Sequence, residues 1–201
     1  MNNIIQNITS NERVVEISFM IEMLDKFCFA NACILDVGGI PSINGSNDSI
    51  ISLIKNKNAK YKVCDFRGGD FTGDFISYEF KDTFDIIMFL SSLEHFSYCT
   101  EGDRLYRAGE DRRGFIKALS ILKKEGIILL TVPFGKHYFT EKSHQNYNMD
   151  GILTLSKGSE LLESYTYKLQ DNLWIQANPD NMADVLYTNI ANGVGCFTFK
   201  K

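Results

Sequence analysis

The stretch that decides the fold is Cys33-Ile34-Leu35-Asp36-Val37-Gly38-Gly39, a short apolar run that contains one acid and ends in two glycines. An apolar run of this length next to turn residues is typical of a strand buried on both faces. Gly38 and Gly39 allow the backbone to turn sharply and to approach a ligand, because neither residue has a Cβ. The stretch therefore predicts a buried strand followed by a tight turn.

Working outward, more apolar runs with strand character follow this one. They lie at 61–66, at 71–80 with an interruption at Gly73, at 84–90 and at 127–132. The run at 84–90 is continuously apolar after Asp85, as expected for a strand covered on both faces of a sheet. Two further runs, 164–169 and 193–200, are predicted to form an antiparallel hairpin at the sheet edge, with a possible turn at 181–186 between them.

Helical patterns alternate with these runs. Thr9 and Glu12 have the spacing of a capping box, which predicts a helix start. The apolar face that follows is predicted to consist of Val14, Ile17, Ile21, Leu24 and Cys28. Shorter helices are predicted at 50–54 and 115–122, the second ending with Lys123 and Lys124 in its last turn and Gly126 at its C′ position. Alternating strands and helices predict an α/β fold with a mainly parallel sheet and helices on both faces.

Composition limits the choice of class. The chain has 201 residues, which fits a single domain over 1–201, and 44% of them are hydrophobic. A net charge of −4 argues against a nucleic-acid partner. The five cysteines form no CxxC pair and are expected to be reduced thiols. Residues 1–10 contain no Lys or Arg, and no apolar run approaches the ~18 residues of a membrane span, so we expect a cytoplasmic protein.

Polar residues follow the predicted strands where ligands bind to an open parallel sheet, at the strands' carboxyl ends. Asp65 ends the second strand, where a carboxylate can accept hydrogen bonds from both hydroxyls of a ribose. A glycine turn after the first strand and an acid after the second are the general pattern of a nucleoside site. Together these loops are predicted to form a cleft, through Asp36, Gly38, Gly39, Asp65, Ser91, Ser92, Glu94, His95, Pro133, Phe134, Gly135, Lys136 and His137.

Three motifs resemble class I S-adenosylmethionine-dependent methyltransferases, and in particular the type 11 group. Ile34-Leu35-Asp36-Val37-Gly38-Gly39 resembles the first motif of this family, and Phe84-Asp85-Ile86-Ile87 with Leu93-Glu94-His95 resembles its fourth-strand motif. Leu122-Lys123-Lys124-Glu125-Gly126 before Thr131-Val132-Pro133 resembles the segment that comes next. The resemblance implies a Rossmann-like, mostly parallel seven-stranded sheet with an antiparallel strand pair at its C-terminal edge. It also implies a lead helix within 1–30, a cofactor-binding core over 31–136, and a substrate loop and terminal strand pair over 137–201.

The same resemblance assigns roles in binding S-adenosylmethionine. Gly38 and Gly39 would pass under the methionine part, next to Asp36, while Leu90 and Ser91 would lie beside it. Asp65 would hold the ribose hydroxyls. Asp74 would face the adenine amino group with Phe75 beside the ring, and Asp70 is the alternative to Asp74 because Gly-Asp-Phe occurs twice. Ile40 and Ser42 depart from the family, which has glycine at both positions.

Acceptor chemistry is predicted to depend on the later loops. His95 is a candidate general base, with a structural role as the alternative. The acceptor pocket is predicted from Glu94, Lys136, His137, His144 and Tyr147. His137 and His144 lack the spacing of a common metal motif, so no metal is expected. The charged segment 98–113 is a candidate lid.

The sequence thus favours methyl transfer from S-adenosylmethionine to oxygen or nitrogen of a small-molecule, sugar or lipid-type acceptor. Two alternatives stay open. One is a catalytically silent methyltransferase fold used for partner binding or regulation, which Ile40 and Ser42 motivate. The other is an NAD-dependent oxidoreductase, although the chain has no Tyr-x-x-x-Lys pair and its glycine turn matches G-x-G-x-x-G no better.

Overall fold

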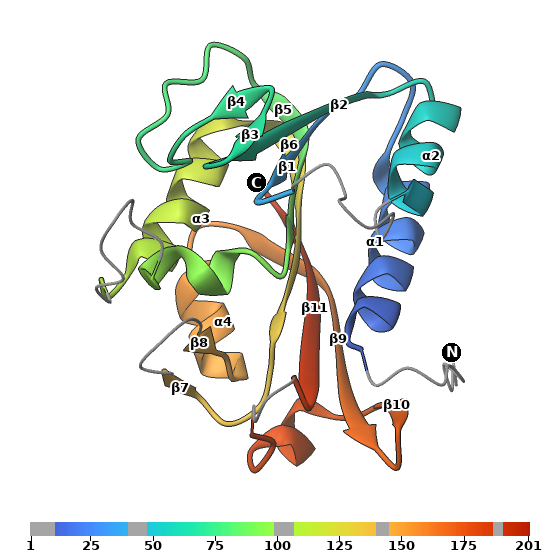
Figure 1. The fold of residues 1–201 in the computed structure, drawn as a ribbon, viewed down its shortest axis with the longest axis vertical. Coiled ribbons are helices and arrows are strands. Elements are labelled where there is room, and N and C mark those ends of the chain that lie inside the picture. Colours follow the sequence, from blue (N-terminus) through green and yellow to red (C-terminus); the bar gives the residue numbers. More distant parts are fainter. Residues whose placement is uncertain (1–10, 40–47, 99–106, 140–144, 187–190) are drawn as a thin grey trace.

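The computed structural model describes residues 11–39, 48–98, 107–139, 145–186 and 191–201. Its centre is an eight-stranded sheet with the strand order β10-β9-β11-β6-β5-β1-β2-β4 (Figure 1). Five neighbouring strands are parallel: β4 (Phe71–Thr72), β2 (Lys60–Asp65), β1 (Cys33–Val37), β5 (Phe84–Leu90) and β6 (Leu122–Pro133). The other three each run antiparallel to their neighbours: β11 (Gly193–Lys200), β9 (Glu160–Gln170) and β10 (Leu173–Gln176).

Helices cover both faces of this sheet. Figure 1 shows α1 (Arg13–Phe27) and α2 (Asp48–Asn56) on one side, and α3 (Glu110–Ile121) and α4 (Met149–Leu155) on the other. Successive side chains of the central strands point to opposite faces, so Ile34 packs in the cluster under α1 while Leu35 packs in the cluster with α3. The same alternation continues through β5 and β6. Two apolar layers therefore explain why these strands are continuously apolar rather than alternating.

Shorter elements shape the loops. The 3₁₀ helix η1 (Leu93–Tyr98) begins three residues after β5 ends, and η2 (Pro179–Met182) precedes β11. β3 (Gly68–Gly69) lies between β2 and β4, and β7 (Tyr138–Phe139) pairs with β8 (Gln145–Asn146) in a separate two-stranded sheet. Within the described ranges, no helix is long and apolar enough to cross a membrane.

The predicted α/β class, the helices on both faces and the pairing of the two C-terminal runs are confirmed. The predicted seven strands were one too few, since β10 adds an eighth strand at the outer edge of β9. The predicted strand over 71–80 was mostly wrong, because only Phe71 and Thr72 pair with β2. The rest of that run instead stacks its aromatic rings: Phe71, Phe75, Tyr78 and Phe80 contact one another edge-on or tilted.

Three helix predictions also need correction. α1 begins at Arg13, and its N-cap residue Glu12 makes no side-chain cap; Thr9 lies outside the described residues. Its buried face is Val15, Glu16, Phe19, Met20, Met23 and Leu24, which is rotated from the predicted one. Val14, Ile17 and Ile21 are only half-buried, because the neighbouring stripe of this largely apolar helix packs better on the sheet.

α3 begins at Glu110, so Glu110–Arg113 form its first turn rather than part of a loop. It ends at Ile121, and β6 starts at the next residue, which places Lys123, Lys124 and Gly126 in the strand. Gly126 is required there for a different reason from the predicted C′ cap. A Cβ on it would lie 2.7 Å from Leu122 Cγ and 2.9 Å from the Lys123 carbonyl.

The cysteine prediction agrees with the structure where it can be tested. Cys28, Cys64 and Cys196 are buried, Cys33 is half-buried, and all four are free thiols. Cys99 lies outside the described residues.

Candidate functional site

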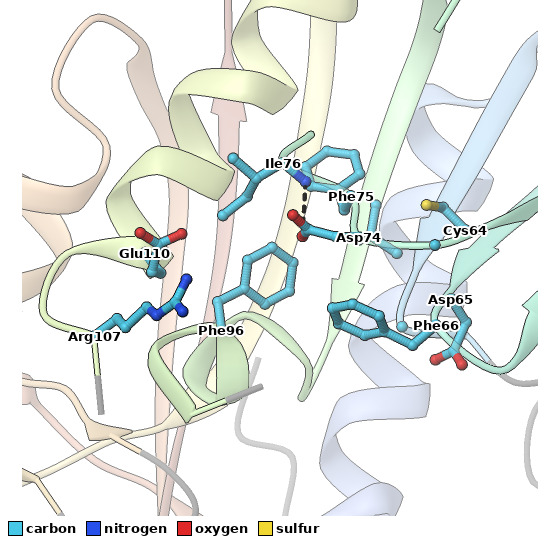
Figure 2. Close-up of a pocket in the computed structure, with 12 residues that line it drawn as sticks. Cys64, Asp65, Phe66, Asp74, Phe75, Ile76, Phe96, Arg107 and Glu110 are labelled. Carbon is cyan, nitrogen blue, oxygen red and sulfur yellow. Dashed lines mark hydrogen bonds between the residues drawn. The ribbon is translucent and has the colours of Figure 1, made fainter. Parts of the chain in front are cut away.

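A pocket opens at the carboxyl ends of β1 and β2, where the glycine turn and Asp65 meet (Figure 2). Its empty space is roughly 530 Å³, including the part that is open to solvent at the mouth. Its lining comes from β1, the β2 end, the loop after β4, η1 and the start of α3: Val37, Gly38, Cys64, Asp65, Phe66, Gly73, Asp74, Phe75, Ile76, Phe96, Arg107 and Glu110.

The glycine turn is fixed by close contacts on both of its residues. Gly38 has a φ of 81°, and its N–H donates to the Cys64 carbonyl at 2.8 Å. A Cβ on Gly38 would lie 2.6 Å from Ser92 Cβ, and a Cβ on Gly39 would lie 2.2 Å from Asp36 Oδ2. Neither position can therefore hold a side chain, which agrees with the tight turn predicted from the two glycines. Ile40 and Ser42 lie outside the described residues.

Asp65 and Asp74 approach the pocket from two different loops. Asp65 Oδ1 accepts a hydrogen bond from the Arg67 N–H at 2.8 Å, which orients the carboxylate at the end of β2. Asp74 Oδ1 accepts from the Ile76 N–H at 3.2 Å, and its Oδ2 accepts from Ser77 Oγ at 2.9 Å. Both acids are thus held in place by their own loops.

The two Gly-Asp-Phe tripeptides occupy different places. Asp70 Oδ2 accepts a hydrogen bond from the Val63 N–H at 2.9 Å, so it fastens the β2–β4 connection, and it does not line the pocket. Asp74 and Phe75 do line it. Of the two acids, only Asp74 therefore lies at the pocket.

Aromatic residues make up much of the wall. Phe75 is buried and packs edge-on against Phe89 at 5.8 Å and against Phe96 at 6.0 Å between ring centroids. Figure 2 shows Phe66 and Phe96 beneath Asp74, with Arg107 and Glu110 beyond Phe96. Phe66, Ile76 and Phe96 were not predicted from the sequence, and Arg107 and Glu110 were predicted only as part of the candidate lid 98–113. Phe96 directly follows the predicted Leu-Glu-His motif, which was the available signal for it.

Asp36 and Glu94 lie outside the pocket lining, and both are almost fully buried, with 1% and 2% of their surface exposed. Asp36 Oδ2 accepts a hydrogen bond from Tyr61 Oη at 2.6 Å. Burial raises the pKa of Asp36 to about 6, against the smaller lowering effects of Tyr61 and Arg13. Burial also raises the pKa of Glu94 to about 7, although His95 and Arg13 lower it.

His95 follows Glu94 in η1 and has 43% of its side chain exposed. Its Nε2 lies 3.7 Å from Glu94 Oε1. The candidate base thus stands at the surface directly beside a buried carboxyl group, at the carboxyl end of β5.

Leu90 is the last residue of β5, and Ser91 follows it beside the first turn of α1. Ser91 has a φ of 45°, which is rare for a residue with a side chain. Its N–H lies 3.1 Å from Thr131 Oγ1, and its hydroxyl donates to Glu16 Oε1. Arg13 Nη1 donates to the Leu90 carbonyl at 3.3 Å and lies 3.2 Å from Glu16 Oε2. Glu16 is fully buried, and the sequence analysis took its position for part of an ordinary amphipathic helix.

The residues predicted to form one acceptor pocket do not lie together in the structure. His137 and Tyr147 line a second, wider pocket with the start of α3 and α4, where Tyr147 Oη donates to the buried Asp111 at 2.8 Å. Lys136 is exposed and lines neither pocket, and Glu94 belongs to the first turn after β5. His144 lies outside the described residues. In the described part of the chain, no group of three His, Cys, Asp or Glu side chains could hold a metal ion.

Comparison with family models places residues 43–189 in one family, described as "Caenorhabditis protein of unknown function, DUF268". The chain belongs to the DUF268 family. The matched range starts after the glycine turn and stops before β11, so it covers most of the sheet but not its first and last strands. A comparison with curated protein sequences found no match.

Solved structures identify the fold of this DUF268 chain as that of class I S-adenosylmethionine-dependent methyltransferases, as the motifs predicted. The N-methyltransferase NodS from Bradyrhizobium japonicum WM9, in complex with S-adenosylhomocysteine, is 12% identical with a TM-score of 0.59, over 94% of this chain and 87% of its own. A methyltransferase from Archaeoglobus fulgidus is 13% identical with a TM-score of 0.59, over 94% of both chains. The cyclase SpnF is 12% identical with a TM-score of 0.59, over 100% of this chain and 86% of its own.

Proposed function

We propose that this protein binds S-adenosylmethionine and transfers its methyl group to oxygen or nitrogen of a small-molecule, sugar or lipid-type acceptor. The observation that carries the proposal is the first pocket. Three loops at the carboxyl ends of β1 and β2 contribute to its lining. They supply the glycine turn, the carboxylate of Asp65 in the position typical of a ribose-binding acid, and Asp74 with Phe75. The family resemblance of the sequence implies the same roles for these residues.

In this proposal the adenosine part occupies the first pocket. Asp65 accepts the ribose hydroxyls, Asp74 accepts from the adenine amino group, and Phe75 and Phe96 supply the apolar wall beside the ring. Gly38 and Gly39 lie under the methionine part, next to Asp36, with Leu90 and Ser91 at its other side. The bound cofactor would supply an electrophilic sulfonium methyl group, so the reactivity comes from the cofactor and not from a protein side chain.

The chain would then act mainly by positioning. It must hold the acceptor atom in line with the methyl group and exclude water, which can contribute several kcal/mol to lowering the barrier. His95 is the candidate base for an acceptor that keeps its proton at neutral pH, because it stands at the end of β5 with its ring partly exposed.

Thermal unfolding with two ligands tests the proposal. S-adenosylhomocysteine at about a hundred times its Kd should stabilise the fold by roughly 2.7 kcal/mol, a rise of several degrees in Tm, and NADH should give none. A rise in Tm with NADH but not with S-adenosylhomocysteine would show that the pocket binds a nicotinamide cofactor instead.

A second candidate is a methyltransferase fold that has lost methyl transfer. Two observations favour keeping it: Ile40 and Ser42 replace family glycines, and SpnF, which shares the fold, is named a cyclase. This candidate predicts that S-adenosylhomocysteine stabilises the protein while no acceptor causes the methyl donor to be consumed.

A further inference from the structure

The chain makes an unusual turn at Ser91, directly after β5. The φ of Ser91, 45°, lies in the left-handed region, which a residue with a side chain rarely adopts. Such a conformation costs free energy and persists only where the surrounding contacts hold it, and residues of this kind are concentrated at ligand sites. The contacts that hold Ser91 are therefore a guide to the function of this turn.

Glu16 of α1 and Thr131 of β6 hold Ser91 in place. The Ser91 hydroxyl donates to Glu16 Oε1, and the Ser91 N–H lies 3.2 Å from the Thr131 carbonyl oxygen and 3.1 Å from Thr131 Oγ1. Arg13, one turn earlier on α1, forms an ion pair with Glu16 at 3.2 Å and donates to the Leu90 carbonyl at 3.3 Å. The first turn of α1 is therefore fastened to the two residues at the end of β5.

Stability of the fold does not explain an acid at position 16. Glu16 is completely buried, whereas the other buried residues of α1 are apolar. Burial raises the pKa of Glu16, against smaller lowering effects of Arg13 and Ser91, so the ionised carboxylate destabilises the folded state. Its Oε2 has the Arg13 ion pair but no hydrogen-bond partner among the described residues. An apolar side chain of similar size would avoid these costs, which indicates a role in function.

The turn at Ser91 brings the next residue, Ser92, against the glycine turn of the first pocket. Ser92 Oγ donates to the Val37 carbonyl at 2.6 Å. A Cβ on Gly38 would lie 2.6 Å from Ser92 Cβ, so the two turns are in close contact. Val37 and Gly38 both line the pocket. A change in the backbone at Ser91 would therefore displace the residue that supports this part of the pocket wall.

We propose that Glu16 is a positioning residue for the first pocket. By accepting a hydrogen bond from Ser91 it holds the turn after β5, and Ser92 in that turn fixes the place of Val37 and Gly38. Glu16 does not line the pocket itself, so it acts on a ligand only through these residues. The inference rests on the proposed function for the identity of the ligand, and on the hydrogen bonds above for the role of Glu16.

Three substitutions in the full chain test this role. Glu16→Leu removes the acceptor and keeps a side chain of similar size, and Ser91→Ala removes the donor from a half-buried position. Glu16→Gln is the conservative variant, because its amide oxygen can still accept a hydrogen bond from Ser91. Glu22→Leu makes the same change as Glu16→Leu at an exposed position of the same helix and is the control. If Glu16→Leu does not fold, Ser91→Ala decides the test.

Calorimetry with S-adenosylhomocysteine, at a temperature at which each variant is folded, gives the first result. Glu16→Leu and Ser91→Ala should each weaken binding about two- to thirtyfold. The two changes together should weaken it no more than either alone, because both break the same contact. Glu16→Gln and Glu22→Leu should bind like the wild type. The Tm of Glu16→Leu should equal or exceed that of the wild type, whereas a residue with only a structural role would lose stability and leave the affinity of the folded protein unchanged.

Amide hydrogen exchange of the ligand-free protein tests the contacts independently. The Gly38 N–H, which donates to the Cys64 carbonyl at 2.8 Å, should exchange faster in Glu16→Leu and Ser91→Ala, while the amides of β9 keep their rates. The inference is overturned if folded Glu16→Leu and Ser91→Ala bind S-adenosylhomocysteine like the Glu22→Leu control. Failure of the proposed function gives a different result, because the wild type itself would then not bind S-adenosylhomocysteine. The exchange rate of Gly38 would then decide, and an unchanged rate in both variants would overturn the inference.

Discussion

Glu94→Gln should stabilise the ligand-free protein at alkaline pH. The Glu94 carboxyl titrates near pH 7 in the folded protein, because it is buried, and near its usual value of 4.5 when the chain is unfolded. Between these pH values the folded state binds more protons than the unfolded state, so the free energy of unfolding falls as pH rises through this window. Glutamine has no charge to bury and removes this dependence.

The size of the effect follows from the pKa difference. A rise from 4.5 to about 7 corresponds to about 3 kcal/mol of lost stability once Glu94 is fully ionised in both states. For a domain of this length, that is a difference of roughly 6–12 °C in Tm. Wild type and Glu94→Gln should therefore be similar near pH 5 and differ by up to about 3 kcal/mol at pH 8.

Urea unfolding at pH 5, 6, 7 and 8 without ligand measures this difference, with Glu79→Gln as the control for loss of an exposed carboxylate. The control should follow the wild type at every pH. A gap between wild type and Glu94→Gln that stays constant with pH, or a variant that becomes the less stable one at pH 8, would refute a buried Glu94 with a raised pKa.

Three other substitutions have defined outcomes. Asp65→Ala should weaken S-adenosylhomocysteine about ten- to a hundredfold without lowering Tm, and unchanged calorimetric affinity would place the ribose contact elsewhere. Gly39→Ala should lower the free energy of unfolding by about 1–3 kcal/mol, because its Cβ would lie 2.2 Å from Asp36 Oδ2; unchanged urea unfolding would contradict this packing. His95→Ala should lower methyl turnover about a hundred- to ten-thousandfold at similar cofactor affinity if His95 is the base. A well-folded His95→Ala variant with near-normal turnover would leave positioning as the source of rate.

Much of the sheet could be predicted because its signals are local. Apart from Asp36, the run from Cys33 to Val37 is apolar on both faces, and Phe84–Leu90 is apolar after Asp85, since both strands lie between two helical layers. The glycine turn and Asp65 were found for a similar reason. Parallel strands bring their carboxyl ends to one edge, so position in the sequence translates directly into position in the fold.

The features that the sequence did not predict depend on distant contacts. Glu16 lies on the buried face of α1, and its carboxyl group accepts a hydrogen bond from Ser91, which is far along the chain. Nothing near position 16 in the sequence signals that contact. The buried face of α1 was predicted wrongly because two adjacent faces of this helix are apolar. Packing on the sheet, which the local sequence does not show, decides which of them is buried. α4 went unnoticed because it is short, although Asn148 caps it by accepting from the Gly151 N–H at 2.8 Å.

The central claim is that the first pocket holds the adenosine part of S-adenosylmethionine. A crystal structure of the protein grown with saturating S-adenosylhomocysteine tests this most directly. We predict that the adenine ring lies beside Phe75 and Phe96 with its amino group toward Asp74, and that the ribose hydroxyls lie within hydrogen-bond distance of Asp65. Adenosine bound elsewhere on the chain, or this pocket empty at a ligand concentration that saturates the protein in solution, would contradict the account.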